Sequence, residues 1–166
     1  MGGIERRANG VMGKILGVDF GDRRTGLAIS DDIGLIAFPR ETLQCPLLLQ
    51  AAAAVAAAAT SLGVERIVVG YPLNLNSTPG PRAARTDEFI AELSKRTSLP
   101  VERWDERLTT CEVERVLIEA GTRRAKRKDV VDKLAAQVIL QNYLDAHAAP
   151  APLDDDGYGA PPEDAP

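Results

Sequence analysis

The chain has 166 residues, of which 45% are hydrophobic, and this suits one folded domain with a substantial core. No apolar run reaches the roughly 18 to 20 residues that a membrane-spanning helix needs. Arg6 and Arg7 near the start are not followed by the apolar stretch of a signal peptide. We therefore expect a cytoplasmic protein that makes no contact with membranes.

The charges are unevenly distributed along the chain. The formal net charge is −4, but from Asp145 onward six acidic residues occur without Lys or Arg, which leaves +2 for the rest. Because local positive patches govern affinity for phosphates, the total does not exclude a nucleic-acid partner. His147 is the only histidine. Catalysis by a histidine base or a histidine-rich zinc site is therefore disfavoured, and carboxylates must carry any chemistry.

The two cysteines, Cys45 and Cys111, form neither a zinc motif nor a disulfide framework. We interpret them as reduced thiols, and a disulfide between two chains through either one stays open.

Five strands are predicted from apolar and β-branched runs. Residues 1–13 show no clear period and are predicted to be a flexible extension, and residues 148–166 a disordered acidic tail. The domain between them covers residues 14–147. Its strands are predicted, in chain order, at 14–20, 25–30, 35–43, 65–70 and 101–104.

Four helices are predicted to alternate with the later strands, at 46–61, 82–97, 109–121 and 129–147. Pro46 suits a first helical position and Gly63 a helix end. Thr109 and Glu112 form a capping box. Residues 71–81, rich in Pro, Asn and Gly, are predicted to be a loop.

This order predicts an α/β fold with a mixed five-stranded sheet. The first three strands follow one another through short turns, which favours an antiparallel meander. The later strands are separated by helices, which favours parallel strands with helices on both faces of the sheet.

Asp19 is the most informative single residue, because it lies inside the apolar run Ile15–Phe20. A buried carboxylate is costly unless it is paired or bound to a cation. One interpretation is a salt bridge to Arg23 or Arg24, and the other is a ligand site. Gly17 and Gly21 favour the second, because glycine lets a ligand or backbone approach closely.

Asp132 heads an apolar column of the last predicted helix that continues through Ala136, Ile139 and Tyr143. The column directs it toward the sheet, whereas the stripe of Lys133, Gln137 and Gln141 is expected to face water. The alternative is that an acid in a first turn only complements the helix dipole.

Glu106 follows the predicted strand 101–104, at the end of a strand where ligands bind in α/β sheets. Asp105 is an alternative, and an exposed loop acid is the simpler interpretation of either. Considered together, Asp19, Glu106 and Asp132 offer the oxygen ligands that Mg²⁺ or Mn²⁺ prefers. Two such ions can activate a water molecule and stabilise the leaving oxygen of a phosphodiester.

A basic run is the first candidate surface for phosphates. Its residues directly precede the predicted helix at 129, and they are Arg123, Arg124, Lys126, Arg127 and Lys128. A solvated linker is the alternative interpretation. The loop 71–81 with Arg82 and Arg85 is a second candidate, where Tyr71, Asn74 and Asn76 either meet bases or sugars or only shape the loop. Trp104 is expected in the core.

Four motifs resemble the YqgF/RuvX family, which has an RNase H-like fold. They are Ile15–Gly21 with Arg24–Ala28, Ile67–Asn74, Asp105–Glu112 and Lys128–Asp145, and they cover residues 14–145 in order. Two positions depart from the usual pattern, with Tyr71 where Leu is usual and Val113 where Ala is usual.

The resemblance implies a metal-dependent nuclease that acts on Holliday junctions or on the precursor of small-subunit ribosomal RNA. It places the three family acids on Asp19, Glu106 and Asp132, as catalytic residues and as ligands of Mg²⁺ or Mn²⁺. Arg24, Arg82 and Arg107 complete the predicted nucleic-acid contacts. A homodimer would suit a symmetric junction.

Two other hypotheses stay open from the sequence. A non-catalytic nucleic-acid-binding factor in ribosome maturation or transcription would share the basic residues without needing all three acids. An actin- or sugar-kinase-like ATPase shares Val18–Gly21, but such enzymes need two domains, and 166 residues are too few.

Overall fold

Five strands form one mixed sheet in the order β3-β2-β1-β4-β5. The computed structural model describes residues 13–74, 76, 78–106 and 124–148, with the backbone alone for residues 124–130. The strands are β1 (Ile15–Phe20), β2 (Arg24–Ser30), β3 (Ala37–Gln44), β4 (Arg66–Tyr71) and β5 (Val101–Asp105). The pairs β1–β2 and β2–β3 are antiparallel, and β1–β4 and β4–β5 are parallel. The predicted mixed sheet is confirmed, with strand ends within two residues.

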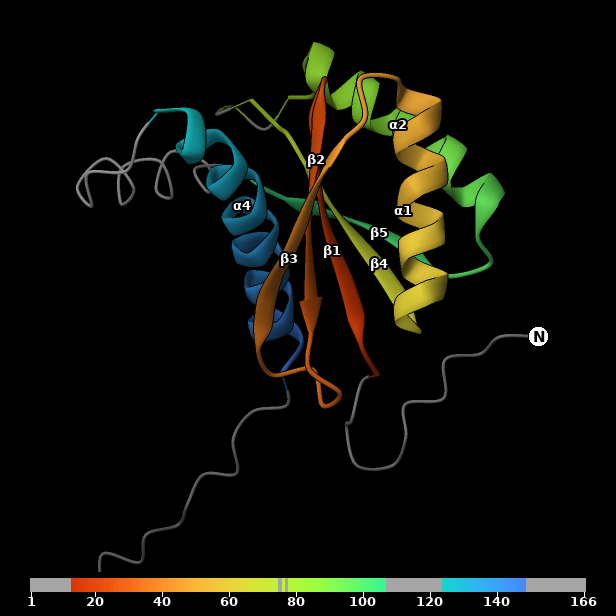
Figure 1. The fold of residues 1–166 in the computed structure, drawn as a ribbon, viewed down its shortest axis with the longest axis vertical. Helices are drawn as coiled ribbons and strands as arrows, with labels where there is room; N and C mark the ends of the chain where they lie inside the picture. The colour runs from red at the N-terminus through yellow and green to blue at the C-terminus, as the bar shows by residue number, and fades with distance from the viewer. Residues whose placement is uncertain (1–12, 75, 77, 107–123, 149–166) are drawn as a thin grey trace, which may run out of the picture.

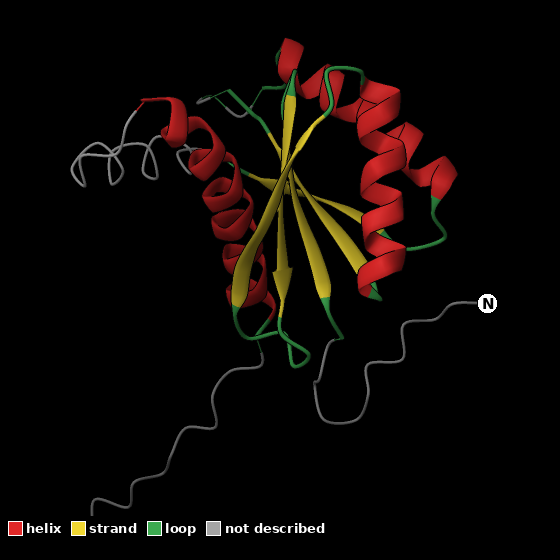
Figure 2. Ribbon diagram, viewed as in Figure 1, coloured by secondary structure: helices red, strands yellow, loops and turns green. Residues whose placement is uncertain are grey.

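Helices cover both faces of this sheet (Figures 1 and 2). Helices α1 (Leu48–Leu62) and α2 (Pro81–Arg96) lie on one side, and α4 (Arg124–His147) lies on the other. The predicted helix at 109–121 lies outside the described residues, as do residues 1–12 and the tail beyond residue 148. None of the helices that the structure describes is long and apolar enough to cross a membrane.

Two predicted helix starts are wrong. Helix α1 begins at Leu48 instead of Pro46, although Gly63 ends it as expected, in the left-handed conformation at φ 66°. Helix α4 begins at Arg124 instead of Asp129. Arg, Lys and Ala are strong helix formers, so the basic residues continue the helix and do not form a linker before it.

The alternation of side chains along β1 assigns its residues to two cores. Leu16, Val18 and Phe20 pack in the core under α1 and α2, whereas Ile15 packs in the core under α4. Gly17 also faces α4, where an added Cβ would lie 2.7 Å from the Cβ of Leu140. Because side chains alternate between the two faces of a strand, Asp19 belongs to the α4 face.

The glutamine stripe of α4 does not face water as predicted. Gln137 Nε2 donates to the carbonyl of Ala37 at 3.0 Å, and Gln141 Nε2 donates to the carbonyl of Leu35 at 2.9 Å. Gln141 Oε1 accepts a hydrogen bond from the Ala37 N–H at 2.9 Å. These amides satisfy main-chain groups at the start of the edge strand β3 and in the turn before it, which would otherwise be left for solvent or another strand.

Candidate active site

Two glycines make room for the site around Asp19. Asp19 and Gly26 are Cα partners in the antiparallel pair of β1 and β2. Gly70 lies on β4, the other neighbour of β1. A Cβ at Gly26 would overlap the carbonyl oxygen of Asp132, and a Cβ at Gly70 would lie 2.5 Å from Oε2 of Glu106. The two other predicted acids therefore occupy space over the strands on either side of β1.

Glu106 follows β5 directly and is held there by the main chain. Its N–H donates to the carbonyl of Tyr71 at 3.3 Å, at the end of β4. The residue is only 9% exposed. The interpretation of Glu106 as an exposed loop acid is therefore wrong, whereas Asp105 is exposed.

Asp132 lies eight residues into α4 and so is not in its first turn. The interpretation of Asp132 as an acid that complements the helix dipole is therefore wrong, because that effect fades within one turn. Its Oδ2 is 3.2 Å from Nε of Arg24, with side chains 22% and 27% exposed. Arg24 thus pairs with Asp132, whereas the sequence interpretation had considered Arg24 as a partner for Asp19.

The electrostatics of Asp19 show that the three acids are neighbours. Burial raises the pKa of Asp19 well above its usual range, and the negative charges of Glu106 and Asp132 raise this pKa further. The positive charge of Arg82 opposes these effects. Burial also raises the pKa of Glu106, against the charge of Arg82 and a hydrogen bond from Asp19. The hydrogen bond from Asp19 to Glu106 raises the pKa of Asp19 and lowers that of Glu106.

The three carboxylates suit a divalent cation, although they are not all close enough together to bind one ion in this structure. Asp19 and Glu106 are two interacting carboxyls with raised pKa values, and a cation would relieve their repulsion. Within the described part of the chain, Oε2 of Glu106 is buried and lacks a hydrogen-bond partner. The described residues contain no group of three acids close enough to surround one ion. The Asp132 carboxylate is directed to Arg24 instead.

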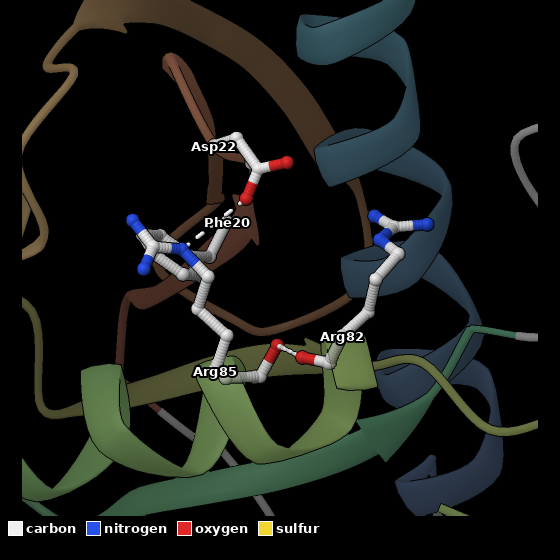
Figure 3. A pocket seen from close by; sticks show the side chains of 6 residues that line it. Phe20, Asp22, Arg82 and Arg85 are labelled. Atoms are coloured by element: carbon white, nitrogen blue, oxygen red, sulfur yellow. Dashed lines mark hydrogen bonds and ion pairs between the residues drawn. The ribbon is translucent and has the colours of Figure 1, made fainter. Parts of the chain in front are cut away.

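Arg82 is the basic residue that reaches this group of acids. It lies in the first turn of α2, after Pro81 at the start of the helix. In Figure 3 its guanidinium extends toward α4, away from the side on which Arg85 lies. Its charge acts on both Asp19 and Glu106. An arginine beside paired carboxylates is placed to meet an anionic group that approaches them.

The other predicted contacts fall into two groups. Arg107 and Arg123 lie outside the described residues, and for Arg124, Lys126, Arg127 and Lys128 only the helical backbone is described. In the loop after β4, Asn74 Nδ2 donates to Thr78 Oγ1 at 3.1 Å, and the Thr78 N–H donates to Asn76 Oδ1 at 3.2 Å. These two asparagines shape the loop.

Two predicted aromatic residues make defined contacts inside the protein. The Tyr71 hydroxyl donates to Asp87 Oδ2 at 2.9 Å, and Arg103 lies over the Tyr71 ring at 5.2 Å. Trp104 is half-buried and meets the ring of Tyr143 edge-on at 5.5 Å, against the core under α4. Trp104 thus packs against the core, as expected, but is not fully buried in it.

The sequence interpretation missed the glycines that matter most. Gly17 admits Leu140 of α4 instead of a ligand, and Gly26 and Gly70 make the space around Asp19. Both Gly26 and Gly70 lie inside predicted strands, where a glycine often marks a close approach of backbone or ligand. That signal was present in the sequence.

Comparisons with known proteins show the family of the chain. The family model described as "RuvX: Holliday junction resolvase" matches residues 13–146. A relative in Symbiobacterium thermophilum, named "Putative pre-16S rRNA nuclease", is 49% identical, with 84% of this chain and 96% of the relative covered. A relative of the same name in Halothermothrix orenii is 47% identical, with 79% and 94% covered.

A solved structure shares the fold. RuvC of T. thermophilus, determined in complex with a Holliday junction substrate, superimposes with a TM-score of 0.52 at 13% identity. The superposition covers 81% of this chain and 94% of that chain. The likeness shows the RNase H-like architecture and, at this identity, nothing more.

Proposed function

The chain belongs to the RuvX family of Holliday junction resolvases, a family of nucleases, and from this premise we propose how it cleaves. We propose that it is a divalent-metal-dependent endonuclease in which Asp19, Glu106 and Asp132 hold Mg²⁺ or Mn²⁺. The substrate is a structured nucleic acid, either a branched DNA or the precursor of small-subunit ribosomal RNA. We propose that it acts in the cytoplasm.

The observation that supports this proposal most is the pair of interacting carboxyls near the ends of β1 and β5, with Asp19 half-buried and Glu106 buried. Burial and mutual repulsion raise the pKa of Asp19, and burial raises that of Glu106. Such a pair is costly in a metal-free protein and favourable around a cation. When bound, the cation would supply Lewis-acid activation of the phosphodiester and of the attacking water.

Each protein group has a separate role in the proposal. Asp19 and Glu106 would hold the cation from the sheet, as carboxylates. Asp132 would hold the cation from α4 by exchanging its ion pair with Arg24 for the metal, and Arg24 would then contact a phosphate. Exchange of an ion-pair partner costs little here, because both side chains are partly exposed. Arg82 orients the scissile phosphate beside the acids.

The flanking contacts are proposed to come from the remaining arginines and lysines of the candidate set. Residues 124–128 form the first turns of α4, the helix that also carries Asp132. Together with Arg107 and Arg123 they would bind phosphates on either side of the cleaved bond. A homodimer is proposed only for a junction substrate, since two symmetric strands must then be cut.

A cleavage assay with two substrates tests the proposal. A synthetic four-way DNA junction and a precursor ribosomal RNA carrying the immature 5′ end are each incubated with Mg²⁺, Mn²⁺ or EDTA. Cleavage is expected only with a cation, and Asp19→Asn should lower its rate by about 10³-fold or more while binding survives. The substrate that is cut at a defined position is the one that the enzyme recognises.

Asp32→Asn is the matched control, because Asp32 is exposed and pairs with Lys14 at the surface. It should cleave like the unmodified protein. Cleavage by Asp19→Asn at the normal rate would contradict the proposal. Binding of either substrate without cleavage under every metal condition would instead favour the non-catalytic binding factor.

A further inference from the structure

A second basic position lies on the opposite face of the sheet from the acids. Phe20, Gly21 and Asp22 at the end of β1 and Arg82, Arg85 and Thr86 of α2 line a cavity of about 150 Å³ (Figure 3). Phe20 packs in the core under α1 and α2, whereas the preceding residue, Asp19, belongs to the α4 face. The cavity and the acids therefore share the end of β1 but open on its two sides.

Arg85 is held at this cavity by weak interactions that a phosphate can replace. Its Nε lies 3.2 Å from Oδ1 of Asp22, with side chains 42% and 82% exposed. An exposed ion pair of this kind stabilises a protein by about 0 to 1 kcal/mol. Although it is near Asp22, Nε of Arg85 makes no hydrogen bond within the described residues. Its guanidinium also lies 6.0 Å from the centre of the Phe20 ring.

Arg82 and Arg85 lie on opposite sides of the end of β1. They are three residues apart, so both project from one face of the first turns of α2. Arg82 extends toward the acids and α4, and Arg85 lies beside Phe20 and Asp22 (Figure 3). A nucleic-acid strand that crosses the end of β1 would thus meet one arginine on each side.

We propose that the cavity beside Arg85 binds the phosphodiester next to the scissile one. Asp22 stays paired with Arg85 until this phosphate binds in its place. The proposal rests on the proposed nuclease function. The cavity has room for a phosphate group, and the Arg85 guanidinium in its lining suits phosphate oxygens. The site therefore recognises the backbone and contributes affinity without sequence preference.

The test measures binding, so that it does not depend on cleavage. All variants are made in the Asp19→Asn background, and dissociation constants for the four-way DNA junction and the precursor RNA are measured at several salt concentrations. Arg85→Ala should weaken binding by about fivefold or more and reduce the slope of log K against log salt by about 0.7 to 0.9, the loss of one phosphate contact. Arg85→Lys should keep the slope, because it keeps the charge.

Arg96→Ala is the matched control, since Arg96 lies at the far end of α2 and pairs with Glu92 at 2.8 Å. It should change neither the affinity nor the slope. The proposal is supported if Arg85→Ala lowers both the affinity and the salt slope, if Arg96→Ala lowers neither, and if the melting temperature is unchanged. An unchanged slope in Arg85→Ala overturns it, whatever the cleavage assay shows for Asp19. The substrate on which the slope changes identifies whether the phosphate belongs to DNA or RNA.

A second variant tests the role of Asp22. Asp22→Asn should tighten binding, because Arg85 loses its competing anion. In the Arg85→Ala background the same change should have a clearly smaller effect, since the two residues then no longer interact. An equal effect of Asp22→Asn in both backgrounds would contradict the exchange of partners.

Discussion

Gly26 and Asp132 are in direct contact through their backbones, because the place of a Cβ on Gly26 is taken by the carbonyl oxygen of Asp132. Gly26 is also the Cα partner of Asp19. One glycine thus fixes how closely the helix that carries one acid approaches the strand that carries another.

Gly26→Ala should therefore separate α4 from β2 near the site. Overpacking of this kind costs about 1 to 3 kcal/mol of the free energy of unfolding. Affinity for Mn²⁺ should also fall, because Asp132 moves away from Asp19. Thermal unfolding and metal titration measure the two effects.

Gly63→Ala serves as the control for this substitution. Gly63 has φ 66° and nothing within 4 Å of an added Cβ, so the cost arises from the backbone alone and is about 1 kcal/mol. Its Mn²⁺ affinity should be unchanged. If Gly26→Ala bound Mn²⁺ as well as Gly63→Ala, the close approach would have no role in the site.

The raised pKa of Asp19 and of Glu106 predicts how stability depends on pH in EDTA. The folded protein holds protons on these carboxyls more tightly than the unfolded chain, in which such groups titrate near pH 4. The stability that these two protonated carboxyls contribute is present below about pH 4. It decreases as the pH rises through the raised pKa values of Asp19 and Glu106. The melting temperature should therefore fall between pH 4 and pH 8. In Asp19→Asn this fall should be smaller. A decrease of the same size in Asp19→Asn would contradict it.

Arg24→Gln should affect stability and metal binding differently. The ion pair with Asp132 is partly exposed, so its loss should cost less than about 1 kcal/mol. Mn²⁺ should bind more tightly, because the Asp132 carboxylate loses a competing cation. Nucleic acid should bind more weakly if Arg24 contacts a phosphate. Calorimetric titration checks the metal effect, and weaker Mn²⁺ binding would count against the proposed exchange.

Tyr71→Phe tests the contact between the Tyr71 hydroxyl and Asp87. The substitution removes the hydrogen bond from the Tyr71 hydroxyl to Asp87 and keeps the ring under Arg103. We expect a loss of about 1 kcal/mol in urea unfolding, with a normal cleavage rate. A large loss of cleavage at unchanged stability would show that Tyr71 meets the substrate, as the loop interpretation had allowed.

The sheet was predictable from the sequence because β1, β2 and β4 are short, mostly apolar runs, and because turns or helices separate the strands. The confirmed order of antiparallel and parallel pairs follows from which runs are separated by helices. Helix starts were less predictable. The strong helix formers between Arg124 and Lys128 have no apolar period, so pattern alone gave no reason to include them in α4.

The candidate site was predictable in its acids but not in their partners. A carboxylate inside an apolar strand, as at Asp19, is detectable from sequence because burial makes it costly. The pairing of Arg24 with Asp132 depends on how α4 lies across β2, which no local pattern specifies. The same holds for Gln141, whose hydrogen bonds to β3 join residues more than 100 positions apart.

Direct titration of Mn²⁺ into the full-length protein tests the central claim most directly, with Asp19→Asn, Glu106→Gln and Asp132→Asn compared against two controls. Asp145→Asn is the control on α4, because Asp145 is exposed and bonds to Gln141, and Asp105→Asn is the control beside Glu106. We predict that each of the three site variants weakens Mn²⁺ binding about tenfold or more, whereas the controls bind normally. Binding that stays unchanged in Asp19→Asn and Asp132→Asn would contradict a shared metal site.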